Sequence, residues 1–137
     1  MIQLLIWLTM FNSYAMALPI ECERFNPKLI NAIVAVESRG DHEAVSSDNA
    51  LGLMQIKYET AKSMGFKGKK TDLNKPQVNL KYGCMYLYQM YIEQHRNIYA
   101  ALDAYYRGPT TVKEDPYKGK WKKHPYIKKI KDELKEK

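Results

Sequence analysis

The chain has 137 residues and a formal net charge of +7. This length suits one domain with a modest core, and the ordinary apolar fraction argues against a disordered or fibrous chain. No internal repeat or low-complexity tract is visible, which excludes a repeat architecture. The positive charge favours an anionic partner such as a cell wall or membrane surface. No nucleic-acid-binding motif accompanies it, so we expect no nucleic-acid partner.

Residues 1–17 carry no charge and are strongly apolar through Phe11. They end in Ala15-Met16-Ala17, a small-x-small sequence typical of signal-peptide cleavage sites. We therefore expect a signal peptide and an exported chain that begins at Leu18, in the periplasm or cell envelope. The usual positive start is missing, and the apolar run is short for a membrane span. An uncleaved anchor and a buried N-terminal helix stay open as alternatives.

Two cysteines, Cys22 and Cys84, are present. In an oxidising compartment we expect them to form a disulfide that ties the mature N-terminus to the central helix. Two buried free thiols are the alternative. No histidine joins them at the spacing of zinc ligands, so we expect no metal site.

Helical periodicity predicts an all-α fold, and no convincing strand pair is visible. The first helix begins at Asn26-Pro27 and runs to about Ser38, because asparagine caps a helix and proline suits its first turn. The later helices are expected at 53–64, 76–94, 98–106 and 125–134. We expect Val78, Tyr82, Met85, Ile92, Ile127, Ile130 and Leu134 to face the core.

Glu37 has an unusual position in this pattern. Its spacing from Ile30 and Ile33 places it on the apolar face of the first helix. Burial and the negative end of the helix dipole both disfavour a carboxylate there, so we expect a raised pKa. A carboxyl group that stays protonated near neutral pH can act as a general acid. The alternative is an acid that turns to water or pairs with Arg39.

Several motifs occur in order at compatible spacings. They are Glu37-Ser38, Ala44-Val45-Ser46, Gly52-Leu53-Met54-Gln55-Ile56, Asp72-Leu73 with Pro76-Gln77-Val78-Asn79-Leu80, Tyr82-Gly83-Cys84-Met85-Tyr86-Leu87, and Ala101-Leu102-Asp103-Ala104-Tyr105 with Gly108-Pro109. The set resembles the lytic transglycosylase family of the goose-type lysozyme-like superfamily, and its last motif is similar to "ALAAYNAGP". The resemblance implies a lysozyme-like single domain, residues 18–137, with short helices around a substrate groove.

The resemblance implies a peptidoglycan lytic transglycosylase that locally opens the cell wall. Such enzymes cleave the β-1,4 bond between N-acetylmuramic acid and N-acetylglucosamine without water and leave 1,6-anhydromuramic ends. Glycoside cleavage normally uses two carboxylates. By this resemblance, Glu37 alone would serve as acid and then as base. The expected partner is the glycan strand of peptidoglycan, and no cofactor is implied.

The resemblance also implies substrate-binding residues, namely Ser46, Met54, Gln55, Tyr105, Tyr106 and Tyr126. The alternatives are a loop cap for Ser46, a structural amide for Gln55 and a core side chain for Met54. Tyr105 matches a family tyrosine that reaches toward the catalytic glutamate, or it is a core aromatic residue. Tyr126 matches a late family tyrosine across a loop.

One departure concerns Tyr106-Arg107, where the family commonly has Asn-Ala. The lost amide would alter how a sugar is bound. Tyr106 would instead stack on a sugar ring, and Arg107 would meet a carboxylate of the peptide stem or the muramic lactyl group. The departure affects substrate detail more than reaction type.

Two other functions stay open. A hydrolytic muramidase would use Asp48, or else Asp41, to orient a water, although both acids also suit a solvated loop. A wall-binding component of a secretion, conjugation or virion assembly would dock through the basic segment 113–137, which otherwise forms a solvated final helix. We expect a monomer.

Overall fold

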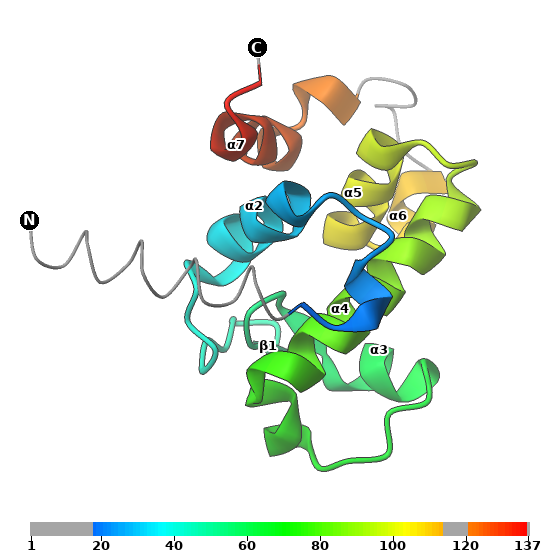
Figure 1. Ribbon diagram of the computed structural model, residues 1–137. Coiled ribbons are helices and arrows are strands. Elements are labelled where there is room, and N and C mark those ends of the chain that lie inside the picture. Colours follow the sequence, from blue (N-terminus) through cyan, green and yellow to red (C-terminus); the bar gives the residue numbers. More distant parts are fainter. Residues whose placement is uncertain (1–17, 114–120, 137) are drawn as a thin grey trace, which may run out of the picture.

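The computed structural model of the protein describes residues 18–113 and 121–136, which are mostly helical (Figure 1). The α-helices are α2 (Pro27–Ser38), α3 (Tyr58–Ser63), α4 (Pro76–Glu93), α5 (Ile98–Arg107), α6 (Pro109–Lys113) and α7 (Pro125–Leu134). The 3-10 helices are η1 (Ile20–Cys22), η2 (Lys70–Asn74) and η3 (Trp121–Lys123), and the strands are β1 (Ala50–Leu51) and β2 (Ile56–Lys57). The predicted signal peptide, residues 1–17, lies outside the described residues.

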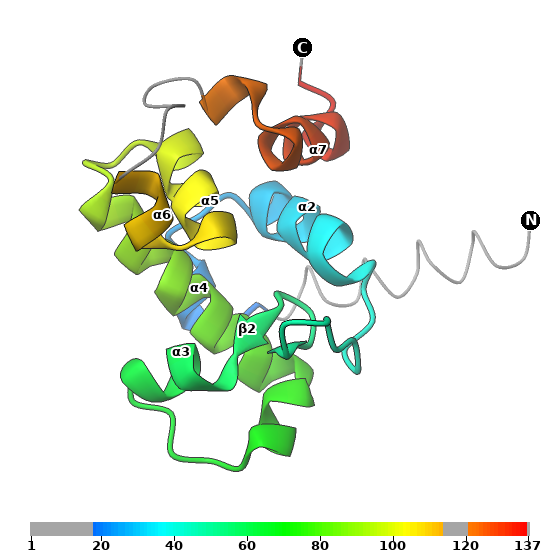
Figure 2. The same cartoon turned by 180° about the vertical axis from the view of Figure 1, so that it is seen from behind.

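Two helix pairs form the body of the fold. Helix α7 packs along α2, and α5 packs along α4. In both views α2 lies between α7 and the α4–α5 pair (Figures 1 and 2). As predicted, Ile127 and Ile130 are fully buried, and Leu134 is partly buried. Within the described ranges, no helix combines the length and apolarity that a membrane span requires.

Helix α2 has the predicted bounds because both of its ends are marked in the sequence. The Asn26 side chain accepts a hydrogen bond from Lys28 N at 2.9 Å, and Pro27 occupies the first turn. Arg39 ends the helix with a left-handed φ of 54°. The helix therefore ends at Ser38, with Glu37 in its last turn.

The helix predicted at 53–64 is wrong in its first half. The chain forms a hairpin there, in which Ala50 pairs with Lys57 and Leu51 pairs with Ile56, and α3 begins only at Tyr58. Gly52 and Gln55 both have left-handed φ values, 73° and 51°, which a continuous right-handed helix cannot contain. The expectation of no strand pair is corrected in the same way.

The buried face of α4 differs in part from the predicted one. Val78 and Tyr82 pack partly buried against the core, whereas Met85 is only half-buried and Ile92 is 43% exposed. The buried residues of this helix are Asn79, Leu80, Gly83, Cys84, Leu87 and Met90. Apolar and tyrosine side chains occur nearly all round the helix, so periodicity does not select a face. The buried face is determined instead by the disulfide and by another segment that packs closely on Gly83.

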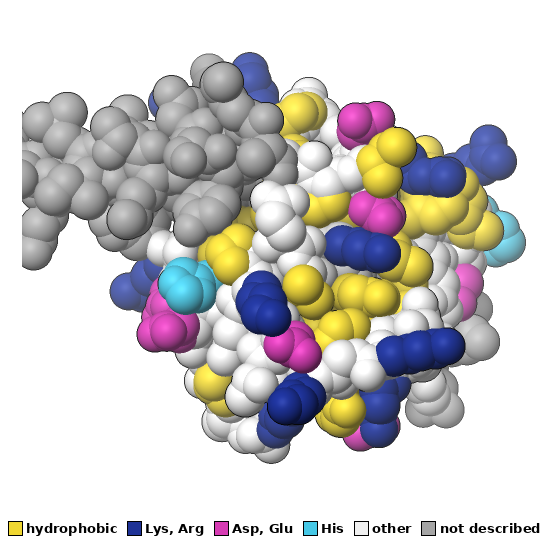
Figure 3. Space-filling view, turned by 60° about the horizontal axis from the view of Figure 1, so that its bottom comes forward, with side chains coloured by type: hydrophobic (Ala, Val, Ile, Leu, Met, Phe, Trp, Pro, Cys, Tyr) yellow, Lys and Arg dark blue, Asp and Glu magenta, His cyan; other side chains and the backbone are white. Residues whose placement is uncertain are grey.

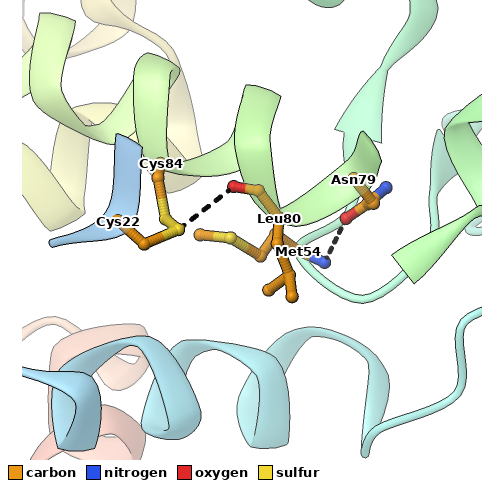
Figure 4. Close-up of a disulfide and its surroundings, with 5 residues drawn as sticks. All are labelled: Cys22, Met54, Asn79, Leu80 and Cys84. Atoms are coloured by element: carbon orange, nitrogen blue, oxygen red, sulfur yellow. Dashed lines mark hydrogen bonds between the residues drawn. A yellow bond between two sulfur atoms is a disulfide. The ribbon is translucent and has the colours of Figure 1, made fainter. Parts of the chain in front are cut away.

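The predicted disulfide between Cys22 and Cys84 is present and joins η1 to α4. Cys22 Sγ lies 3.4 Å from Leu80 O, a contact and not a donated hydrogen bond, because an oxidised sulfur carries no proton. Figure 4 shows the Met54 side chain reaching toward this disulfide. A Cβ atom at Gly83 would overlap the Met54 sulfur, so glycine lets these groups pack closely.

We expect the disulfide to contribute substantially to stability. It closes a sequence separation of 62 residues, and loop entropy then gives an upper-end contribution of about 4 kcal/mol. The variant Cys22→Ser/Cys84→Ser should unfold at a lower urea concentration than the parent. A thiol reductant should lower the parent's midpoint toward that of the variant and leave the variant unchanged. Equal midpoints for the two proteins under oxidising conditions would contradict this expectation.

Candidate active site

A cleft of about 470 Å³ opens beside the last turn of α2, a size typical of small-ligand sites. The lining residues from the predicted site are Glu37, Ser46, Gln55, Tyr105 and Tyr106. The others are Asp48, Ala50, Ile56, Lys57, Thr60, Tyr86, Arg107 and Gly108. Asp41 does not line the cleft. Among the described residues, no group of three or more His, Cys, Asp or Glu side chains could hold a metal ion.

Glu37 has the environment that its position in the sequence predicts. The buried Ile30 and Ile33 precede it on α2. Burial raises the pKa of its carboxyl group from 4.5 to about 7. No salt bridge to Glu37 forms within the described part of the chain, so the alternative of pairing with Arg39 is not adopted. Near neutral pH a large fraction of Glu37 is therefore protonated.

Tyr126, at the start of α7, has a buried hydroxyl close to Glu37. Hydrogen bonding from this hydroxyl favours the carboxylate and offsets part of the increase in the pKa of Glu37. In the described residues Tyr126 Oη has no hydrogen bond of ordinary geometry, so the contact with Glu37 is loose. Tyr106 stacks on the Tyr126 ring, with centroids 4.4 Å apart and planes 8° apart.

The turn at residues 51–55 is held by side chains from three helices. Asn79 comes from α4, Ser38 from α2 and Tyr105 from α5. The bonds are Asn79 Nδ2 to Leu51 O at 2.6 Å, Met54 N to Asn79 Oδ1 at 2.7 Å, Ser38 Oγ to Leu53 O at 2.8 Å and Tyr105 Oη to Met54 O at 2.6 Å. These bonds satisfy buried polar groups that the short hairpin leaves without partners.

Gly52 is needed at the start of this turn for two reasons. Its left-handed φ of 73° suits glycine, and a Cβ atom there would overlap the Asn79 amide. The same atom would lie 3.0 Å from Leu73 O, to which Asn79 Nδ2 also donates at 2.9 Å. The glycine therefore allows Asn79 to reach the turn.

Gln55 and Ser46 combine a structural position with a place in the cleft wall. Gln55 Nε2 donates to Ala44 O at 3.2 Å and to Gly52 O at 3.1 Å. Ser46 Oγ accepts from Asp48 N at 3.2 Å and from Ala50 N at 3.1 Å. Ser46 thus acts as a loop cap and Gln55 as a structural amide, the alternatives to substrate contact that the sequence leaves open. Their contact with substrate stays a prediction.

Met54 has no exposed surface and packs on Gly83, which matches the core alternative for this residue. Ser38 and Asn79 were not among the predicted site residues, although both occur in the quoted motifs. A polar residue on the buried side of an apolar helix was the available signal. It indicates a hydrogen-bond partner without identifying it.

Arg107 lines the cleft and is bound by an acid that sequence analysis did not single out. Its Nε donates to Asp103 Oδ1 at 2.6 Å, and its Nη2 donates to Oδ2 at 2.5 Å. The Asp103 side chain has no exposed surface, and that of Arg107 is 16% exposed. Both residues stand where the pattern "ALAAYNAGP" has alanine. Two of the three departures from the pattern are therefore partners in one ion pair.

Residues 19–131 match the family described as "Transglycosylase SLT domain". The chain belongs to this family. Two of its curated relatives are proteins named "Endo-type membrane-bound lytic murein transglycosylase A", from Salmonella paratyphi A and Salmonella paratyphi B. Each is 44% identical to this chain over 69 residues, which cover 45% of this chain and 34% of the relative. The chain therefore spans about a third of the length of these relatives.

Solved structures of larger transglycosylases share the fold. An inactive mutant of the lytic transglycosylase Slt of Pseudomonas aeruginosa has a TM-score of 0.64 and 28% identity, covering 80% of this chain and 19% of its own. The 70 kDa soluble lytic transglycosylase in complex with bulgecin A has a TM-score of 0.67 and 23% identity, covering 87% and 20%. The Escherichia coli 70 kDa enzyme has a TM-score of 0.61. The predicted lysozyme-like fold is thus confirmed.

We expect Glu37 to make the fold less stable as the pH rises. Its pKa is about 7 in the folded protein against an ordinary 4.5, so ionisation is harder in the folded state. Its contribution to the free energy of unfolding is therefore full below pH 4.5 and is lost as the pH rises through about 7. The total loss is about 3 kcal/mol. Glu37→Gln should be more stable than the parent above neutral pH.

Urea unfolding across this pH range measures the difference between parent and Glu37→Gln. Glu43→Gln is the matched control, because Glu43 is an exposed acid in the neighbouring loop. It should keep the pH dependence of the parent. A constant difference between parent and Glu37→Gln at every pH would contradict the burial effect on Glu37.

Proposed function

We propose that the protein is a peptidoglycan lytic transglycosylase in which Glu37 is both the acid and the base. The proposal depends above all on one observation, a glutamic acid with a pKa of about 7 in the wall of a cleft. Such a carboxyl group gives up a proton readily and takes it back readily near neutral pH. Membership of the family supports the choice of a murein substrate.

In the first step neutral Glu37 donates its proton to the glycosidic oxygen between N-acetylmuramic acid and N-acetylglucosamine. The bond between that oxygen and C1 of the muramic residue breaks, and positive charge spreads over C1 and the ring oxygen. The new Glu37 carboxylate lies close to this charge and stabilises it. The 6-hydroxyl of the same muramic residue then attacks C1 and returns a proton to Glu37. One bond has replaced another, and no water is consumed.

The neighbouring tyrosines have different parts in this proposal. Tyr126 would tighten its loose hydrogen bond as Glu37 becomes a carboxylate, which favours the charged intermediate stage. Tyr105 would act through the backbone, since its hydroxyl already binds Met54 O at 2.6 Å. Ser46, Gln55 and the 55%-exposed Tyr106 would contact sugar directly, because all three line the cleft.

We further propose that residues 1–17 are a signal peptide and that residues 18–137 act on glycan strands in the periplasm or cell envelope. The net charge of +7 favours approach to an anionic wall. Figure 3 shows Lys and Arg side chains distributed around hydrophobic ones on one face of the molecule. Docking of the basic segment 113–137 to a secretion, conjugation or virion assembly, and a monomeric state, belong to the same proposal.

A second candidate function, hydrolysis, is favoured by the place of Asp48. This acid lines the same cleft as Glu37, as a residue that orients a water would have to. Its backbone amide donates to Ser46 Oγ, which fixes the loop that carries it. The two candidates differ in product, since a hydrolase leaves a reducing muramic end.

We expect the purified protein to release anhydromuropeptides from peptidoglycan. Glu37→Gln should lower the rate by at least about a thousandfold, because amide and carboxyl group have the same shape but only the acid donates a proton. Mass spectrometry of the soluble products measures both results. Asp48→Asn is the control and should leave the anhydro products in place. Reducing-end products that disappear in Asp48→Asn would instead establish hydrolysis.

The rate should also fall as the pH rises above about 7, since only protonated Glu37 starts the reaction. Tyr126→Phe keeps the ring and removes the hydroxyl that favours the carboxylate. The pKa of Glu37 should then rise, and the alkaline fall in kcat/KM should move to higher pH. A pH–rate profile of parent and variant measures the shift. A shift to lower pH would contradict the assigned part of Tyr126.

A further inference from the structure

We propose that Arg107, held in place by the buried Asp103, binds a carboxylate on the muramic acid substituent of the glycan strand. This inference rests on the proposed function, because it names the part of a peptidoglycan strand that this end of the cleft recognises. It goes further by assigning specificity to a pair of residues that replaces two alanines of the family pattern.

The geometry of the pair suits a recognition group. Asp103 and Arg107 are one turn apart on α5, and the carboxylate meets the guanidinium through two parallel hydrogen bonds of 2.6 Å and 2.5 Å. Such a bidentate pair fixes the plane of the guanidinium group. A side chain that is already ordered loses little further freedom when it binds a ligand. Arg107 is thereby preorganised at the cleft that also contains Glu37.

Stability alone gives a poor account of this ion pair. A helical pair at this spacing contributes only a few tenths of a kcal/mol when exposed, and burying its carboxylate has a desolvation cost. Replacing buried ion pairs by apolar residues is often neutral or stabilising. The alanines of "ALAAYNAGP" are such a replacement at these two positions. A costly pair at the wall of the cleft is better explained by a ligand.

The chemistry of the guanidinium group selects the ligand. It carries five N–H donors in a planar fork that fits a carboxylate, and can serve Asp103 and a ligand together. Because Asp103 balances its charge, recognition depends on directed hydrogen bonds more than on net charge. On a glycan strand only the muramic residue bears carboxylates. They belong to the peptide stem or, where the peptide has been removed, to the lactyl group.

The test compares three ligands in a Glu37→Gln background, which prevents turnover. They are strands with intact peptide stems, strands stripped of their stems so that the lactyl carboxylate is free, and an N-acetylglucosamine oligomer without carboxylates. Calorimetry measures affinity for Asp103→Ala/Arg107→Ala, which removes both members of the ion pair and restores the alanines of the pattern. Arg107→Lys keeps the charge and loses the planar fork.

We expect the double variant to bind carboxylate-bearing strands at least about tenfold more weakly and the uncharged oligomer about equally well. Arg107→Lys should recover only part of the loss. A loss confined to stem-bearing strands identifies the peptide carboxylate, and a loss confined to stripped strands identifies the lactyl group. Equal affinities of background protein and double variant for both strands, or a matching loss for the oligomer, would overturn the inference.

Product analysis of the protein with Glu37 intact separates this inference from the proposed function. Suppose that the protein releases anhydro products and that the double substitution leaves its affinity for the strands unchanged. This result would overturn the role of Arg107 and leave the proposed reaction intact. Absence of any cleavage product would overturn the proposed reaction, whereas the binding comparison would still decide whether Arg107 recognises a carboxylate.

Discussion

The cleft depends on the hydrogen bonds that the buried side-chain amide of Asn79 makes. It binds one carbonyl and one amide of the turn at residues 51–55 and a carbonyl of η2, so one side chain replaces the partners that regular structure would supply. Ser38 and Tyr105 bind the two remaining inward carbonyls of the turn. Because these three side chains come from α4, α2 and α5, the turn reaches its form only when the helices have packed. The position of the cleft wall is thus a consequence of the core.

The sequence predicts helices well where local chemistry marks their ends. These signals act within a few residues of each boundary. They are capping by Asn26, proline in the first turns of α2, α4 and α7, and a left-handed residue after α2. The hairpin is not predictable in this way, since strands of two residues show no periodicity and Gln55 adopts a left-handed φ without being glycine. The face of α4 is selected by contacts far away in the sequence, namely the disulfide and the Met54 side chain at Gly83.

The residues of the candidate site also fall into those that local sequence predicts and those that it does not. Glu37 can be found from the sequence because its peculiarity, an acid on an apolar helix face, is local. The partners of Asn79 in the turn lie 25 and 28 residues away, so no local pattern reveals them. Asp103 is an intermediate case in how far the sequence predicts it. It stands among Ala101, Leu102 and Ala104, and the reasoning that selects Glu37 applies to it equally.

Glu37 and Asp103 are both acids on the buried face of a helix, and the structure accommodates them in different ways. A carboxylate taken out of water needs a cation or must keep its proton. Asp103 receives a guanidinium group one helical turn away, which stabilises its charge and fixes Arg107. Within the described ranges, Glu37 receives only the hydroxyl of Tyr126, which favours the carboxylate too weakly to offset burial, and its pKa stays at about 7. A cation beside Glu37 would stabilise the fold at neutral pH and remove the acid. Among the described residues, the fold thus places a cation beside Asp103 and none beside Glu37, which suits the proton transfer proposed for Glu37.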